Sequence, residues 1–137
     1  MWWIYALLAA VFAALTTIFA KIGVRDINSD LATAIRTVVI LIFAWGIALF
    51  RGETRGMTLI SKQGLLFLTL SGIATGLSWL FFFRALQLGR ASQVAPVDKL
   101  SLALVIILSV IFLGEPLTWK IAVGGLLIIG GTFVLIL

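Results

Sequence analysis

Five long apolar runs divide this sequence, and they constrain its fold more than any other feature. They cover residues 2–20, 31–50, 64–83, 91–113 and 119–137. Each is close to the ~20 residues that an α-helix needs to cross the hydrocarbon core of a bilayer. The sequence therefore predicts an all-α integral membrane protein, with five transmembrane helices forming one membrane domain over residues 1–137.

The residue inventory agrees with a membrane location and argues against an enzyme. The chain is 63% hydrophobic and 11% charged, whereas soluble domains carry about 25% charged residues. It has no cysteine and no histidine, which excludes disulfides, thiolate nucleophiles, His-based triads and Cys/His metal sites. The acidic residues are scattered singly, at Asp26, Asp30, Glu53, Asp98 and Glu115. We expect no catalytic residue, no metal and no cofactor.

The net charge of +5 does not indicate a nucleic-acid partner. The basic residues stand singly between apolar runs, without the polar surroundings of a basic binding patch. Loop charges beside membrane helices explain them better.

The distribution of these basic residues leaves the membrane orientation open. Four lie in connections on one side, at Lys21, Arg25, Arg84 and Arg90, and four on the other, at Arg51, Arg55, Lys62 and Lys120. Because Lys and Arg in short loops set orientation, a balanced chain favours dual topology, with copies inserting both ways. The alternatives are a miscounted charge, of which Arg84 near a helix end is the weakest, or a partner protein that sets the orientation.

Two oppositely inserted copies would form a ten-helix body with a two-fold axis in the membrane plane. Closed two-fold dimers are the commonest oligomers. Transporters built from inverted repeats have this symmetry, and their substrate sites lie near the midplane between the repeats.

The stretches FFFRALQLGRASQVAPVDKLS at 81–101 and FLGEPLTWKIAVGGLLIIGG at 112–131 carry recognisable motifs. They resemble the EamA family of the drug/metabolite transporter superfamily. The resemblance implies a unit that is usually found twice, in inverted orientation, within one ten-helix polypeptide. It also implies transport of small metabolites through a central cavity. A single five-helix unit of this kind calls for a partner, which we expect to be a second, antiparallel copy in the plasma membrane of a bacterium or archaeon.

The small multidrug resistance family is a shorter relative in the same superfamily. The resemblance implies that its members exchange protons for cationic drugs at a carboxylate midway along the first helix. Aligned on Lys21, that position falls near Ala13, and residues 2–20 contain no acid. The sequence argues against an exporter of this design, which stays an alternative.

The fourth apolar run carries two charges and a proline near its start. Asp98 and Lys99 lie 7–8 residues into it, a depth of about 10–12 Å at ~1.5 Å per residue. Neighbours on an ideal helix diverge by ~100°, so we expect each to seek a different partner. Pro96 removes one helical hydrogen bond and predicts a kink. This segment lines a solute pathway, or else forms a structural ion-pair network, or lets Lys99 snorkel.

Other candidates lie on the first three runs. Arg36 is close enough to a helix start to snorkel, and Asp98 is its alternative partner in an intramembrane ion pair. Ser78 and Trp79, and Thr17 on the first run, are candidates for lining the pathway, because transport sites combine aromatic walls with a few polar groups. Hydroxyls that only satisfy their own helix are the alternative.

The last run is apolar and rich in glycine. Gly124 and Gly131 lie two turns apart on one helix face, with Gly125 and Gly130 beside them. Small residues let membrane helices approach closely, so this helix is predicted to pack the dimer, or otherwise to pack within the chain.

These observations favour a transporter of small metabolites or amino-acid-like solutes, working by alternating access as an antiparallel homodimer in the lipid bilayer. The rivals are a structural subunit, an obligate heterodimer subunit of a membrane complex, and a passive channel.

Overall fold

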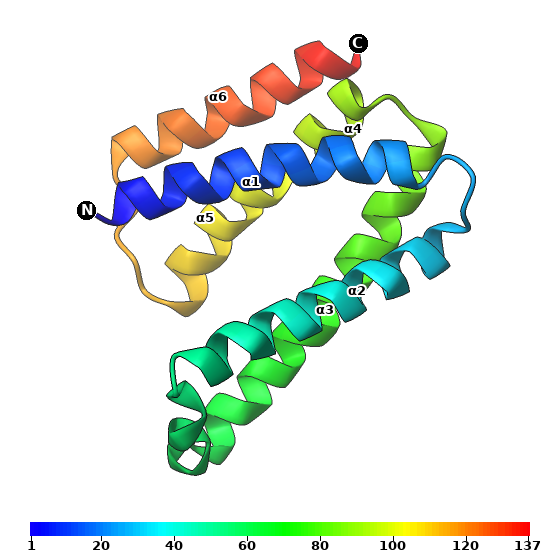
Figure 1. Ribbon diagram of the computed structural model, residues 1–137. Helices are drawn as coiled ribbons and strands as arrows, with labels where there is room; N and C mark the ends of the chain where they lie inside the picture. The colour runs from blue at the N-terminus through cyan, green and yellow to red at the C-terminus, as the bar shows by residue number, and fades with distance from the viewer. The chain divides into compact units, whose positions relative to one another are not determined.

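The computed structural model describes residues 1–137 and is wholly helical (Figure 1). Its helices are α1 (Trp2–Gly23), α2 (Ser29–Phe50), the 3₁₀ helix η1 (Glu53–Leu59), α3 (Lys62–Leu88), α4 (Ala91–Asp98), α5 (Leu100–Phe112) and α6 (Trp119–Ile136). Five segments are long and apolar enough to cross a membrane, with α4 and α5 together forming the fourth, Ala91–Phe112. The predicted all-α fold with five membrane-spanning helices is confirmed.

Local sequence explains where these helices begin and end. The Asn28 side chain accepts a hydrogen bond from the Asp30 amide at 2.8 Å and caps α2. Thr118 caps α6 in the same way, accepting from Ile121 N. Gly52 and Gly114 have φ of 69° and 66°, a left-handed conformation that glycine adopts without steric cost, and they follow the ends of α2 and α5.

The end of the third helix and the second connection differ most from those predicted. The third helix was expected to end at residue 83 but continues to Leu88, so Arg84 lies within a helix rather than in a connection. The prediction was wrong because it followed the apolar run, whereas Phe83 and Leu86 both remain buried on the continuing helix. The second connection, expected to be irregular, contains η1.

The chain divides into two compact units. The first contains Met1–Ile18 and Leu88–Leu137, and the second contains Phe19–Gln87. In the first unit, α6 packs against α4 and α5. Ala103 of α5 is buried, and Gly125 of α6 lies against the same helix, where a Cβ would come within 3.3 Å of Ile106 Cδ1.

The second unit has its buried core at one end. Val24, Phe83 and Leu86 are at most 2% exposed, where the turn between α1 and α2 meets the end of α3. Lys21 Nζ donates to the Leu86 carbonyl. Gln87 Nε2 donates to the carbonyls of Val24 and Ile27, at 3.0 and 2.6 Å. Two carbonyls of the turn are therefore bound by a side chain of α3.

Candidate functional site

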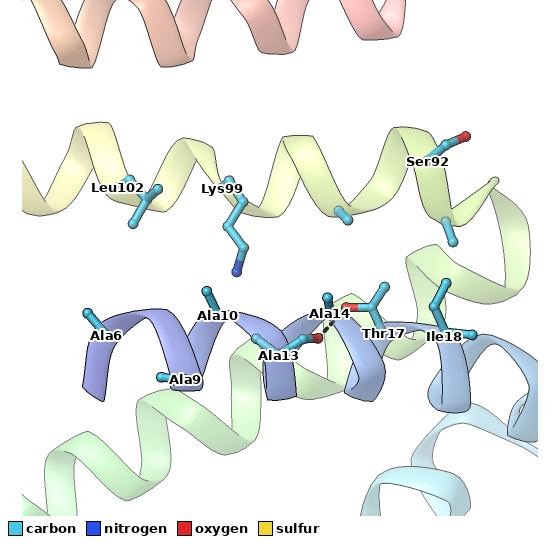
Figure 2. Close-up of a pocket in the computed structure, with 12 residues that line it drawn as sticks. Ala6, Ala9, Ala10, Ala13, Ala14, Thr17, Ile18, Ser92, Lys99 and Leu102 are labelled. Atoms are coloured by element: carbon cyan, nitrogen blue, oxygen red, sulfur yellow. Dashed lines mark hydrogen bonds between the residues drawn. The ribbon is translucent and has the colours of Figure 1, made fainter. Parts of the chain in front are cut away.

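The first unit contains a cavity of about 760 Å³ between α1 and the α4–α5 segment (Figure 2). This volume lies within the usual range for small-molecule sites, about 300–1,000 Å³. One wall is a row of alanines on α1, namely Ala6, Ala9, Ala10, Ala13 and Ala14. Their short side chains leave the space that the cavity occupies.

The opposite wall carries the only charged group that lines the cavity. Ala91, Ala95 and Leu102 are apolar, whereas Lys99 projects its amine across the gap toward α1 (Figure 2). A charged side chain in the interior of a membrane helix costs free energy, and such residues commonly mark a functional site.

Asp98 and Lys99 form an ion pair, with 3.4 Å between Lys99 Nζ and Asp98 Oδ2. The expectation that adjacent residues would seek different partners was wrong, because the helix is interrupted at this point. α4 ends at Asp98, α5 begins at Leu100, and Lys99 lies between them. The interruption falls three residues after Pro96, where the Lys99 amide bonds to the Ala95 carbonyl. Asp98 itself does not line the cavity.

Two hydroxyl groups border the cavity from opposite walls. Thr17 lies on the α1 side, where its hydroxyl donates to the Ala13 carbonyl at 3.0 Å. Ser92 lies on α4, with its hydroxyl directed away from α1 (Figure 2). The structure thus brings Thr17 and Lys99 to one cavity, and Thr17 keeps oxygen lone pairs that can accept a further hydrogen bond.

Arg36 and Trp79 contact each other in the second unit. The Arg36 guanidinium carbon lies 3.9 Å from the centre of the Trp79 ring and 5.4 Å from that of Phe83. This is a cation–π arrangement, which is worth about 0.5–1 kcal/mol at exposed sites and about 2 kcal/mol or more when desolvated, and both residues here are half-buried. It joins α2 to α3 and occupies one face of Trp79. Ser78, the neighbouring candidate, is exposed. An ion pair between Arg36 and Asp98 stays a prediction.

The glycines of α6 differ in their surroundings. Gly125 packs against α5, so this residue serves packing within the chain. A Cβ at Gly124, Gly130 or Gly131 would meet no atom within 4 Å. These three are available to a partner, as a dimer helix requires, and their role in a dimer stays a prediction.

Sequence reasoning missed the alanine wall of α1. The alanines follow helical spacing, and together with Thr17 they mark one face of the helix. Their periodicity was the available signal. Taken alone, small residues on a membrane helix usually indicate helix packing, so this periodicity would not have identified a cavity wall.

The five apolar helices, and a charged group lining a cavity between two of them, define a multi-pass integral membrane protein. The chain belongs to the EamA-like transporter family, whose family model matches residues 1–137. This confirms the resemblance seen at 81–101 and 112–131.

Two relatives cover almost the whole chain. An uncharacterized transporter in the cobO 3′ region of Sinorhizobium sp. is 52% identical over 98% of this chain and 95% of its own length. An uncharacterized protein of Methanocaldococcus jannaschii is 31% identical over 96% of this chain and 93% of its own length. No solved structure shows a significant match. Together with the family, the first relative identifies the chain as a membrane transporter in general terms.

Proposed function

We propose that this protein carries small metabolites or amino-acid-like solutes across a membrane by alternating access, as an antiparallel homodimer. The observation that carries the proposal is the cavity between α1 and α4–α5, which presents Lys99 and Thr17 on otherwise apolar walls. Transport sites combine an apolar lining with a few polar groups in this way.

The antiparallel pairing rests on the charges and on the relatives. Counting the residues at helix ends together with the connections, Lys and Arg are balanced, four and four, on the two predicted sides of the membrane. The Sinorhizobium relative is named a transporter, and the match to this chain spans 95% of its length. Two inverted copies would restore the ten-helix symmetry of inverted-repeat transporters. That relative also favours the plasma membrane of a bacterium.

The cavity walls argue against a cation exporter of the small multidrug type. Ala13, the position aligned with the carboxylate of that family, contributes a methyl group to the cavity wall. The charged group facing it is the cation Lys99, which repels a cationic drug.

Solute counterflow in liposomes tests the proposal. The purified chain is reconstituted and screened with labelled anionic, zwitterionic and cationic metabolites. We expect saturable uptake that is accelerated by unlabelled solute inside. Ala13→Leu should abolish it by filling the cavity, whereas Ala74→Leu, on an exposed face of α3, should not. Flux that rises linearly with concentration would indicate a channel, and no flux of any solute would indicate a structural subunit.

A further inference from the structure

We infer that the cavity between α1 and α4–α5 binds solutes through an anionic group, a carboxylate or a similar oxyanion, that contacts Lys99. This inference rests on the proposed transport function and specifies its substrate class. It starts from charge: among the residues lining the cavity, Lys99 carries the only ionised side chain, and it is a cation.

Lys99 lies deep in its membrane span, so an anionic partner would stabilise its charge. At about 1.5 Å per residue, it lies about 12 Å along the span that begins at Ala91. A lysine near the centre of a membrane helix costs about 2.5–3.5 kcal/mol on insertion scales. An oxyanion in the cavity would offset part of this cost.

The protein itself satisfies this ammonium group only in part. An ammonium has three hydrogen-bond donors, and Asp98 Oδ2, at 3.4 Å, is the one acceptor within hydrogen-bonding distance. That distance is long for a charge-assisted bond, which is about 2.7–2.9 Å. Donor capacity therefore remains on the side that faces α1 (Figure 2).

The position of Asp98 gives it a defined role in this site. It pairs with Lys99 from outside the cavity lining, so a solute anion entering the cavity approaches the same ammonium from the other side. The two anions repel each other and share one cation. Asp98 is thus a competitor for Lys99, which weakens solute binding and favours release.

The apolar lining of the cavity indicates what kind of group carries the anionic group of the solute. The facing wall is made of alanine methyl groups, and Leu102 extends the opposite wall. These surfaces favour a compact apolar body attached to the anionic group. The Thr17 hydroxyl, already donating within its own helix, adds an acceptor at one end of the α1 wall.

Three probes with the same branched body separate charge from shape: 4-methylpentanoate, 4-methylpentanamide and 4-methylpentylamine. Their binding to the purified chain is measured by equilibrium dialysis in phosphatidylcholine nanodiscs, with empty nanodiscs as the blank. We expect the carboxylate to bind more tightly than the amide, and the amine not to bind. Lys99→Gln should weaken carboxylate binding by about 10- to 100-fold, the loss expected for a charged hydrogen bond, and leave the amide unchanged.

Asp98→Asn is the second variant, and its effect should have the opposite sign. Removing the competing carboxylate should tighten binding of 4-methylpentanoate. A purely structural ion pair would instead make both variants less stable and change affinity in the same direction. If Lys99→Gln does not fold, the direction of the Asp98→Asn effect decides the question by itself.

Three results would overturn the inference. They are equal binding of carboxylate and amide, tighter binding of the amine, or loss of carboxylate binding when phosphatidylglycerol is added to the nanodiscs. The last result would identify a lipid headgroup as the anion. Counterflow of a cationic or neutral solute without carboxylate preference would refute the anion site and leave transport standing. Carboxylate binding without any flux would refute transport and leave the anion site standing.

Discussion

Thr132 places its hydroxyl close to carbonyl groups of two different helices. It is 4% exposed on α6, and its oxygen lies 2.8 Å from the Ile128 carbonyl of its own helix and 3.3 Å from the Pro96 carbonyl of α4. A hydroxyl in the last turns of a Gly-rich helix gives no sign in the sequence that it reaches another helix. The contact joins α6 to the segment that carries the cavity.

Thr132→Val should therefore destabilise the first unit. The substitution keeps the shape and removes the donor, and hydrogen bonds between membrane helices are worth about 0.6–1.7 kcal/mol. Thr69→Val is the matched control, because the Thr69 hydroxyl bonds only to the Leu65 carbonyl of its own helix. We expect a lower midpoint of unfolding in detergent for Thr132→Val than for Thr69→Val. Equal midpoints would show that the Pro96 contact contributes nothing.

The sequence predicted part of what the structure shows for Asp98 and Lys99. Both residues were predicted to be important because intramembrane charges are rare. Their mutual contact was not predicted, and it occurs where the helix is interrupted at Lys99. Pro96 predicted a disturbance of the helix, and only the structure locates the interruption after Asp98.

At the scale of single elements, hydropathy located all five spans and misplaced one end. The apolar run of α3 stops at Phe83, but the helix continues through Arg84 and Gln87 because Leu86 is buried and Gln87 binds the preceding turn. The hydropathy of the sequence marks the part of a helix that lies in the bilayer. The end of α3 is instead set by packing and by hydrogen bonds to the turn between α1 and α2. Those contacts are between segments distant in sequence and leave no local pattern.

The glycines of α6 allow separate predictions for the face that packs on α5 and the face that contacts no other part of the subunit. Gly124→Leu with Gly131→Leu should give monomers in mild detergent that remain folded, because a Cβ at either position meets no atom of the subunit within 4 Å. Gly125→Leu should destabilise the subunit by about 1–3 kcal/mol through overpacking against Ile106.

Size-exclusion chromatography with light scattering and thermal unfolding separate these effects. A dimer that survives the double substitution would move the interface away from this face of α6. A stable Gly125→Leu subunit would show that α5 and α6 adjust their spacing freely.

At the scale of the whole molecule, the natural absence of cysteine makes the orientation measurable. Asp26→Cys and Thr58→Cys place a thiol on exposed positions of two successive connections. Dual topology predicts that an impermeant maleimide labels roughly half of each variant in intact vesicles, and all of it after permeabilisation. Full labelling of one variant and none of the other would establish a single orientation and rule out an antiparallel homodimer.

The turn between α1 and α2 bears on how the chain can be oriented in the membrane. Its carbonyls at Val24 and Ile27 are bound by the amide of Gln87, and the carbonyl of Leu86 by Lys21. Because these three carbonyls are satisfied within the chain, they need no hydrogen-bond donor from the compartment that the turn faces. Insertion in both orientations, which would place the turn in two different compartments, would require this independence.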